Sequence, residues 1–265
     1  MKSLIDPVVA LAEEAGRAIL EVYSTEFEVQ SKEDDSPLTQ ADLAAHRCIV
    51  AGLEKLTPDM PLISEEDGLP EFAERGSWNR YWLIDPLDGT REFVNRNGEF
   101  TVNIALIDNH RPVFGVVHVP VQSKTYVGCE GFGAELRDGD LPAQTIRVAV
   151  KSADPVRVVG SRSHRGASLD AYLENLGESD MIPMGSSLKF CVIAEGGADI
   201  YPRLGPTSEW DTAAAQAVVE QAGGKVLELD GKPLSYNAKS EILNPWFIVI
   251  GAADTDWLAL LATGE

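Results

Sequence analysis

The sequence has few cysteines and histidines and no long apolar run. Cys48, Cys129 and Cys191 are too few and too far apart for a disulfide framework, so we expect reduced, partly buried thiols in a cytoplasmic protein. The four histidines are scattered and show no zinc-binding spacing. No stretch reaches the roughly 18 apolar residues of a membrane span, and Asp6 interrupts the apolar segment that a signal peptide needs. These absences exclude small disulfide-rich, zinc-finger and membrane-spanning classes.

Basic residues are also scarce: 22 Lys and Arg stand against 42 Asp and Glu, which gives a formal net charge of −20. Surfaces that bind nucleic acid polymers need clustered basic side chains, so this composition argues against that class of partner. A phosphorylated small substrate would meet the same difficulty, because the protein supplies little positive charge. Such a substrate would need bound cations in the site.

The pattern of apolar residues changes between the two halves of the chain. Residues 1–150 begin with two amphipathic helices, one starting at Asp6-Pro7 and one over residues 39–56, and continue into a β-rich meander. Residues 151–265 alternate between strands and helices, without a Gly-, Ser- or Pro-rich linker at the boundary. We therefore expect an α+β half and an α/β half that pack together around a shared cleft. The expected strands are residues 61–64, 81–84, 101–107, 113–119, 124–128, 157–160, 199–202, 225–229 and 246–250, and the later helices are 168–176, 186–195, 211–222 and 254–261.

Two carboxylates follow the apolar strand at residues 81–84. Asp85 and Asp88 lie three residues apart in a turn, so their side chains are expected to come close together. Close anions repel unless a cation lies between them, and a set of oxygen ligands without His or Cys suits Mg²⁺ or Mn²⁺. A plain aspartate-rich turn has the same composition and stays open as an alternative.

Two further acids occupy similar places. Glu65 follows the strand at residues 61–64, and Asp211 is expected to open a helix. Taken singly, Asp211 could be a helix N-cap and Glu65 part of a solvated loop. Taken with Asp85 and Asp88, they form the kind of carboxylate set that builds a two-metal site for phosphoryl transfer.

These acids also match known motifs. The segment Asp85-Pro86-Leu87-Asp88-Gly89-Thr90 differs from the DxDGT motif of haloacid dehalogenases, because its two aspartates are three residues apart instead of two. Together with Glu65-Glu66-Asp67 and Glu209-Trp210-Asp211-Thr212-Ala213-Ala214, it resembles the metal-binding signatures of the inositol monophosphatase superfamily, Mg²⁺-dependent and lithium-sensitive phosphatases. The match covers almost the whole chain.

Three less specific segments resemble the bacterial 3'(2'),5'-bisphosphate nucleotidase branch of that superfamily. They are Lys32-x-Asp34-x-Ser36-Pro37-x-Thr39-x-x-Asp42, Gly160-Ser161-Arg162-Ser163-His164 and Gly185-Ser186-Ser187-Leu188-Lys189-Phe190. The resemblance implies a layered αβαβα sugar-phosphatase fold with most metal ligands in residues 1–150 and Asp211 in residues 151–265.

The resemblance also implies a set of ligands and roles. Two or three Mg²⁺ ions are implied, with Mn²⁺ as an alternative ion. Glu65, Asp85 and the Leu87 carbonyl would hold one ion, and Asp85, Asp88 and Asp211 a second. Asp42 and Thr90, assisted by Glu65, would position and deprotonate the attacking water. Asp42 also fits a capping box with Thr39, so a structural role stays open for it.

The substrate is implied to contact the metal-site residues and a second anion site. The backbone amides of Gly89 and Thr90 would receive phosphate oxygens, beside Glu65, Leu87, Asp88 and Asp211. Ser186, Ser187 and Lys189 would bind a second phosphate, with Arg162, His164 and Arg203 as other candidates. N-capping by Ser186 and a solvated position for Lys189 are the alternatives.

The pattern of strands and helices predicts an α/β protein, and the resemblance implies an enzyme that hydrolyses the 3'-phosphate of adenosine 3',5'-bisphosphate to AMP and phosphate. The resemblance implies a role in sulfate assimilation, 3'-phosphoadenylyl sulfate as a further substrate, a cytoplasmic location and peripheral association with the inner membrane. An inositol monophosphatase or another sugar phosphatase of the same family is the alternative. A non-catalytic protein that binds divalent cations or nucleotides is the alternative from another class. The sequence does not specify the oligomeric state.

Overall fold

The structure is a computed structural model that describes residues 1–26, 29–31, 37–161 and 166–261. Its helices are α1 (Ile5–Tyr23), α2 (Gln40–Leu56), α3 (Phe72–Arg75), α4 (Thr90–Val94), α5 (Ala167–Leu176), α6 (Leu188–Ala194) and α7 (Glu209–Gln221), with 3-10 turns η1 (Lys2–Leu4), η2 (Glu65–Asp67), η3 (Pro120–Gln122) and η4 (Trp257–Leu260). Its strands are β1 (Gln30–Ser31), β2 (Pro37–Leu38), β3 (Leu62–Ser64), β4 (Arg80–Asp88), β5 (Thr101–Asp108), β6 (Arg111–Val119), β7 (Lys124–Cys129), β8 (Gly133–Asp138), β9 (Gln144–Thr145), β10 (Val156–Ser161), β11 (Ser179–Met184), β12 (Ile200–Arg203), β13 (Lys225–Glu228) and β14 (Phe247–Ile250).

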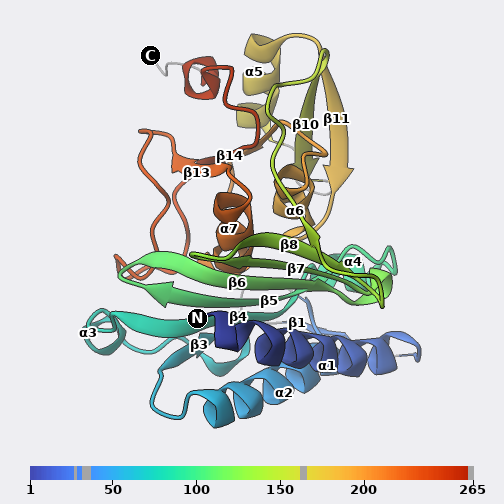
Figure 1. Cartoon of the computed structure of the whole chain (residues 1–265), viewed down its shortest axis with the longest axis vertical. Helices are drawn as coiled ribbons and strands as arrows, with labels where there is room; N and C mark the ends of the chain where they lie inside the picture. Colours follow the sequence, from blue (N-terminus) through green and yellow to red (C-terminus); the bar gives the residue numbers. More distant parts are fainter. Residues whose placement is uncertain (27–28, 32–36, 162–165, 262–265) are drawn as a thin grey trace.

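Five layers of helix and sheet stack along the long axis of the molecule (Figure 1). Helices α1 and α2 cover the outer face of a sheet in the order β3-β4-β5-β6-β7-β8-β9, and α7 packs on its inner face. Helices α6 and α7 separate that sheet from a second one in the order β11-β10-β12-β14-β13, and α5 lies beyond the second sheet. This arrangement confirms the predicted αβαβα fold.

The first sheet carries the acidic residues of the predicted site at one end. Its strands are antiparallel apart from β3 and β4, which run parallel to each other. Glu65, after β3, and Asp85, in β4, therefore lie toward the same end of the sheet. Both faces of β4 to β7 are covered by helices, and almost every residue of these strands is buried. The continuous burial explains why these strands are read from the sequence as apolar runs without alternation.

Two glycines let α7 lie directly on the first sheet. A Cβ atom on Gly115 of β6 would come within 2.1 Å of the Ala214 carbonyl oxygen, and one on Gly128 of β7 within 2.4 Å of the Ala217 carbonyl oxygen. Helix α7 also carries small side chains that allow this close packing: its buried residues include Ala213, Ala214, Ala215 and Ala217. The close approach fixes the height of α7, and hence of Asp211 in its first turn, above the sheet.

We expect Gly115→Ala to lower the free energy of unfolding by about 1–3 kcal/mol, because overpacking of this size forces the backbone of α7 away from the sheet. Urea denaturation followed by circular dichroism measures this effect. Gly205→Ala is the matched control, because a Cβ there would meet no described atom within 4 Å. Equal losses in both variants would show that the Gly115 contact does not limit packing.

The second sheet belongs to the alternating half of the chain. The predicted boundary near residue 150 lies between β9 and β10, but one core cluster includes side chains from both sides of it, among them Ile63, Val117, Ala214 and Phe247. The division into domains 1–150 and 151–265 stays a prediction. Strand β11 was not predicted; it is an edge strand, where Pro183 is tolerated, and its side chains are only half-buried.

Some predicted element ends are wrong. Helix α1 starts at Ile5 after η1, and Asp6 lies in its first turn instead of capping it, with an oxygen 2.8 Å from Arg137. The predicted helix at residues 254–261 is only η4, because Asp254 accepts hydrogen bonds from Ser152 and Trp257 is buried. Residues 254–261 are therefore held by tertiary contacts as well as by the short 3-10 turn η4.

The cysteines are free thiols as predicted, with Cys129 and Cys191 buried and Cys48 partly buried. Among the described residues, none of the helices has both the length and the apolar character needed to cross a bilayer.

Candidate metal centre and active site

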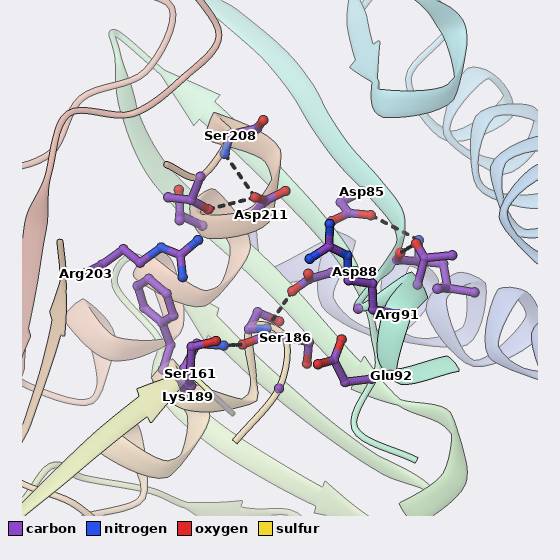
Figure 2. Close-up of a pocket in the computed structure, with 18 of the residues that line it drawn as sticks. Asp85, Asp88, Arg91, Glu92, Ser161, Ser186, Lys189, Arg203, Ser208 and Asp211 are labelled. Carbon is purple, nitrogen blue, oxygen red and sulfur yellow. Dashed lines mark hydrogen bonds between the residues drawn. The ribbon is translucent and has the colours of Figure 1, made fainter. Parts of the chain in front are cut away.

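A cavity of about 400 Å³ opens between the end of the first sheet and the first turns of α4, α6 and α7 (Figure 2). Most of the predicted metal, catalytic and anion-binding residues line it. Its walls are Glu65, Asp85, Leu87, Asp88, Gly89, Thr90, Arg91, Glu92, Ser161, Gly185, Ser186, Ser187, Lys189, Phe190, Tyr201, Arg203, Pro206, Thr207, Ser208, Asp211, Thr212 and Leu243. Residues from both halves of the chain therefore meet in one site.

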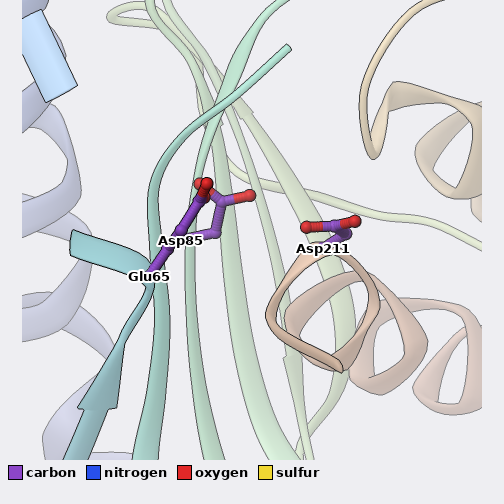
Figure 3. A group of neighbouring side chains, drawn as sticks. All are labelled: Glu65, Asp85 and Asp211. Atoms are coloured by element: carbon purple, nitrogen blue, oxygen red, sulfur yellow. The ribbon is translucent and has the colours of Figure 1, made fainter. Parts of the chain in front are cut away.

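Three carboxylates come together at the base of this cavity. Glu65, Asp85 and Asp211 each offer an oxygen, and these atoms lie within 4.8 Å of one another. Figure 3 shows Asp85 between Glu65 and Asp211. The side chains come from three elements, η2, β4 and α7, so the cluster forms only when the chain has folded.

Asp85 is the most constrained of the three. It is buried, and its Oδ1 accepts a hydrogen bond from the Leu87 amide at 3.1 Å, within a β-bulge between Asp85 and Asp88. Burial raises the pKa of Asp85 well above its ordinary value, and the neighbouring charges of Glu65, Asp88 and Asp211 raise it further. The ionised form of Asp85 therefore needs a positive partner in the cavity.

Asp88 faces the same cavity from the end of β4. Its Oδ2 accepts a hydrogen bond of 2.5 Å from the Ser187 amide. Burial raises the pKa of Asp88 to about 7, Asp211 adds to this, and the Lys189 charge and the Ser187 amide oppose it. Ser187 is itself buried and donates its hydroxyl to Asn103 at 2.8 Å. Asp88 thus connects the metal-ligand loop to the start of α6.

Asp211 lies at the third position of α7. Ser208 is the N-cap, and Asp211 Oδ2 accepts hydrogen bonds from the Ser208 amide at 2.9 Å and the Thr207 hydroxyl at 2.7 Å. The expectation that Asp211 opens the helix is therefore wrong by two residues. The spacing Ser208-x-x-Asp211 is a capping box, and this signal could have located Thr207 and Ser208 as residues that orient the carboxylate.

Thr90 and Asp42 meet at the edge of the cavity. The Thr90 hydroxyl lies 3.4 Å from Asp42 Oδ1 and 3.3 Å from the Leu87 carbonyl oxygen. Asp42 Oδ2 accepts hydrogen bonds from the amide and hydroxyl of Thr39, so the capping box at the start of α2 is also present. The capping role of Asp42 and its predicted role beside Thr90 are compatible, because Oδ2 faces Thr39 and Oδ1 faces Thr90.

The loop before α6 forms the wall of the cavity next to Asp88. Ser186 has a positive φ of 45°, so α6 begins only at Leu188, two residues later than predicted. Lys189 is buried, which makes the solvated alternative wrong; its Nζ donates to the Ser186 carbonyl oxygen at 2.6 Å and lies 5.6 Å from the centre of the Tyr201 ring. Burial lowers the pKa of Lys189 to about 8, although Asp88 favours the charged form.

Several other candidates have different outcomes. Arg203, on β12, lines the cavity (Figure 2). Its guanidinium donates to the Pro206 carbonyl oxygen. Gly89 has a φ of 90°, and a Cβ there would come within 3.0 Å of the Glu99 carbonyl oxygen, so the turn requires glycine. The following candidates and motif residues lie outside the described residues: Lys32, Asp34, Ser36, Arg162, Ser163 and His164.

The donor set fits a hard divalent cation. Glu65, Asp85 and Asp211 provide carboxylate oxygens only, which suit Mg²⁺ and Mn²⁺. Because Asp85 is buried among other acids, a bound cation would remove the repulsion between them. The structure therefore contains a site whose chemistry matches a divalent cation.

Comparisons with known proteins agree with this geometry. The profile of the Inositol monophosphatase family matches residues 1–258. The 3'(2'),5'-bisphosphate nucleotidase CysQ of Escherichia coli (strain K12) is 50% identical over 93% of this chain and 99% of its own length. The crystal structure of CysQ from Bacteroides thetaiotaomicron, a bacterial member of the inositol monophosphatase family, is 40% identical, has a TM-score of 0.84 and covers 96% of this chain and 99% of that chain.

A second solved structure is similar in fold alone. It is an IMPase/NADP phosphatase complexed with Mg²⁺ and phosphate, 19% identical, with a TM-score of 0.79 over 100% of this chain and 97% of that chain. The family match, the 50% identity over nearly the full length and the cluster of carboxylates in the cavity agree. The chain belongs to the inositol monophosphatase family, whose members are metal-dependent.

Proposed function

We propose that the protein is a Mg²⁺-dependent 3'(2'),5'-bisphosphate nucleotidase that converts adenosine 3',5'-bisphosphate to AMP and phosphate. The observation that carries this proposal is the trio Glu65, Asp85 and Asp211 at the base of a cavity that also holds a buried lysine. The name of the relative that is 50% identical over nearly its whole length supports the choice of substrate.

The acids would hold two ions. Glu65, Asp85 and the Leu87 carbonyl would hold the first, and Asp85, Asp88 and Asp211 the second, with a third ion or Mn²⁺ also compatible with the oxygen donors. Such ions lower the pKa of water and stabilise negative charge on the oxygens around phosphorus. Glu65, Leu87, Asp88 and Asp211 would thereby also face the substrate phosphate.

The chain's own groups would orient the attacking water. Thr90 stands beside the acid cluster with its hydroxyl between Asp42 and the Leu87 carbonyl. Asp42 would take the proton of the attacking water by way of the Thr90 hydroxyl, while its other oxygen stays fixed by Thr39. Glu65 would assist as a base, and the Gly89 and Thr90 amides would receive phosphate oxygens in the same wall of the cavity.

The second phosphate would bind at the wall formed by the loop before α6. Lys189 is a buried cation within the cavity lining, and its ammonium group has three donors, which serve the Ser186 carbonyl oxygen at 2.6 Å and, more weakly, the Met184 carbonyl oxygen at 3.5 Å. Ser186 and Ser187 carry the loop that positions it, and Arg203 adds a second positive charge from β12. A bisphosphate would thus be held at both ends.

We further propose that the enzyme acts in sulfate assimilation, accepts 3'-phosphoadenylyl sulfate and is inhibited by Li⁺. A cytoplasmic location, with peripheral association at the inner membrane, is part of the same proposal, which follows from the family resemblance of the sequence motifs.

A phosphate-release panel with Mg²⁺ tests the proposed function. Adenosine 3',5'-bisphosphate should give the highest kcat/KM, ahead of inositol 1-phosphate and fructose 1,6-bisphosphate. Higher kcat/KM for a sugar phosphate would make the protein a sugar phosphatase of the same family. Mg²⁺ binding without turnover of any of the three would favour a non-catalytic cation-binding protein.

The second anion site gives a separate prediction. Lys189→Met should lower kcat/KM for adenosine 3',5'-bisphosphate roughly ten- to a hundredfold, the effect of about one charge-assisted hydrogen bond, and affect inositol 1-phosphate much less. Steady-state kinetics on both substrates measures the difference. Lys225→Met, at an exposed lysine of β13, is the matched control. Equal losses on both substrates would mean that Lys189 only supports the loop before α6.

A further inference from the structure

Arg75 is a charged residue with no exposed surface. It ends α3, in the segment that follows Glu65-Glu66-Asp67, and its relative accessibility is 0%. Its guanidinium donates through Nε to the Pro70 carbonyl oxygen at 3.1 Å and through the other nitrogens to Asn237 Oδ1 and the Ser240 carbonyl oxygen. Burial of a full charge is costly unless hydrogen-bond partners compensate for the lost water, so these bonds offset the cost of burying the Arg75 guanidinium.

The contact with Asn237 is reciprocal. The Asn237 side-chain amide donates back to the Arg75 carbonyl oxygen at 2.6 Å, and Asn237 is itself 1% exposed with a positive φ of 53°. The Asn237 backbone amide donates to Glu209 Oε2 at 2.8 Å. Arg75 therefore reaches the first residue of α7 through one intermediate residue: the Asn237 side chain bonds to Arg75, 162 positions away in the sequence, and the Asn237 backbone amide bonds to Glu209.

The segment that Arg75 holds, residues 237–244, runs along the start of α7. The Glu209 amide donates to the Ile242 carbonyl oxygen at 2.9 Å, and the Asn244 amide donates to the Thr207 carbonyl oxygen at 2.8 Å. The Asn244 side chain donates to the Ser208 carbonyl oxygen at 2.9 Å. Thr207 and Ser208 are the residues that hydrogen-bond to Asp211, so segment 237–244 braces the groups that orient this carboxylate.

We propose that Arg75 is a positioning residue for the metal centre: through segment 237–244 it fixes Asp211 of α7 relative to Glu65. Glu65 and Arg75 lie on the same stretch of chain between β3 and β4, whereas Asp211 comes from the other half of the sequence. The proposal rests on the proposed function in that Glu65 and Asp211 are taken as ligands of the same centre.

Arginine suits this position because its planar guanidinium serves acceptors in several directions at once. Lysine offers a single ammonium that cannot reproduce the fork geometry toward Asn237 and Ser240. Groups that orient metal ligands without touching the ion commonly contribute roughly ten- to a hundredfold to metal affinity. Thr207 and Ser208 are such groups for Asp211, and Arg75 acts through them, so we expect Arg75→Met to weaken metal binding by up to that factor, and Arg75→Lys to recover part of it.

The experiment measures Mn²⁺ binding to the full-length protein by electron paramagnetic resonance, with the Mg²⁺ concentration for half-maximal activity and the substrate KM as kinetic readouts. Arg75→Met should raise the Mn²⁺ dissociation constant and the Mg²⁺ requirement, while KM at saturating Mg²⁺ changes little. Arg80→Met is the matched control, because Arg80 is half-exposed and pairs with Asp108. It should bind Mn²⁺ like the wild type.

A second variant keeps the test decisive if Arg75→Met does not fold. Asn237→Gly tolerates the positive φ, leaves Arg75 in place and removes only the side-chain link, so it should weaken Mn²⁺ binding severalfold. Lower melting temperature with unchanged Mn²⁺ affinity in the folded variants would overturn the positioning role. A wild-type protein that binds no Mn²⁺ would instead overturn the proposed metal-dependent function.

Discussion

Asp85→Asn should lower kcat/KM for adenosine 3',5'-bisphosphate by at least roughly a thousandfold. The reason is that Asp85 lies between Glu65 and Asp211 and is proposed to serve both ions, and metal ions contribute several kcal/mol to the stabilisation of developing charge. Phosphate release at saturating Mg²⁺ measures this loss. The asparagine keeps the size of the side chain, so the effect reports on charge instead of packing.

A thermal readout separates metal binding from catalysis in the same variant. A ligand at a hundred times its Kd stabilises a protein by about 2.7 kcal/mol, so the wild type should melt at a higher temperature with excess Mg²⁺. Asp85→Asn should lose this shift, whereas Asp140→Asn, an equal change of charge at an exposed turn, should keep it and its activity. Full turnover of either protein in a chelator would contradict the metal mechanism.

The first sheet was the part of the fold that the sequence predicted best. Strands β4 to β7 are buried on both faces, so they stand out as apolar runs between turn residues. Strand β11 was missed because an edge strand with half-buried side chains and Pro183 has neither an apolar run nor an alternating pattern. Whether a strand lies at the edge of a sheet depends on how the other strands pair, so the residues of the strand alone do not predict it.

The site, too, contains residues that the sequence predicts and contacts that only the folded structure reveals. Glu65, Asp85, Asp88 and Asp211 were predicted from their places next to apolar segments and from the motifs, and the structure brings all four to one cavity. The predicted turn at residues 85–88 is part of β4, where a β-bulge interrupts the strand pairing. The bond between Asp88 and the Ser187 amide was not found, because it joins residues 99 positions apart. Arg75 carries no sequence signal either: its burial depends on Asn237 and Ser240, which only tertiary structure brings to it. The roles of the site residues stay predictions for kinetics.

Thr90→Ala should lower kcat by roughly 10²–10⁴-fold, the usual contribution of a general acid–base group, while leaving metal affinity nearly unchanged. The hydroxyl is proposed to orient the attacking water together with Asp42, and the carboxylates Glu65, Asp85 and Asp211 are proposed to hold the ions. The two effects are therefore separable in one variant. Single-turnover phosphate release measures the rate, and calorimetry with Mg²⁺ measures the affinity.

Thr90→Ser is the matched control, because it keeps the hydroxyl and removes only a methyl group at the start of α4. It should retain most of the rate, since serine can reach the same two acceptors, Asp42 Oδ1 and the Leu87 carbonyl oxygen, that lie 3.4 Å and 3.3 Å from the threonine hydroxyl. If metal affinity falls together with the rate in Thr90→Ala, the hydroxyl shapes the loop that carries Asp85 and Asp88. In that case the water would have to be oriented by Glu65 alone, and Glu65→Gln would then cost more activity than Thr90→Ala.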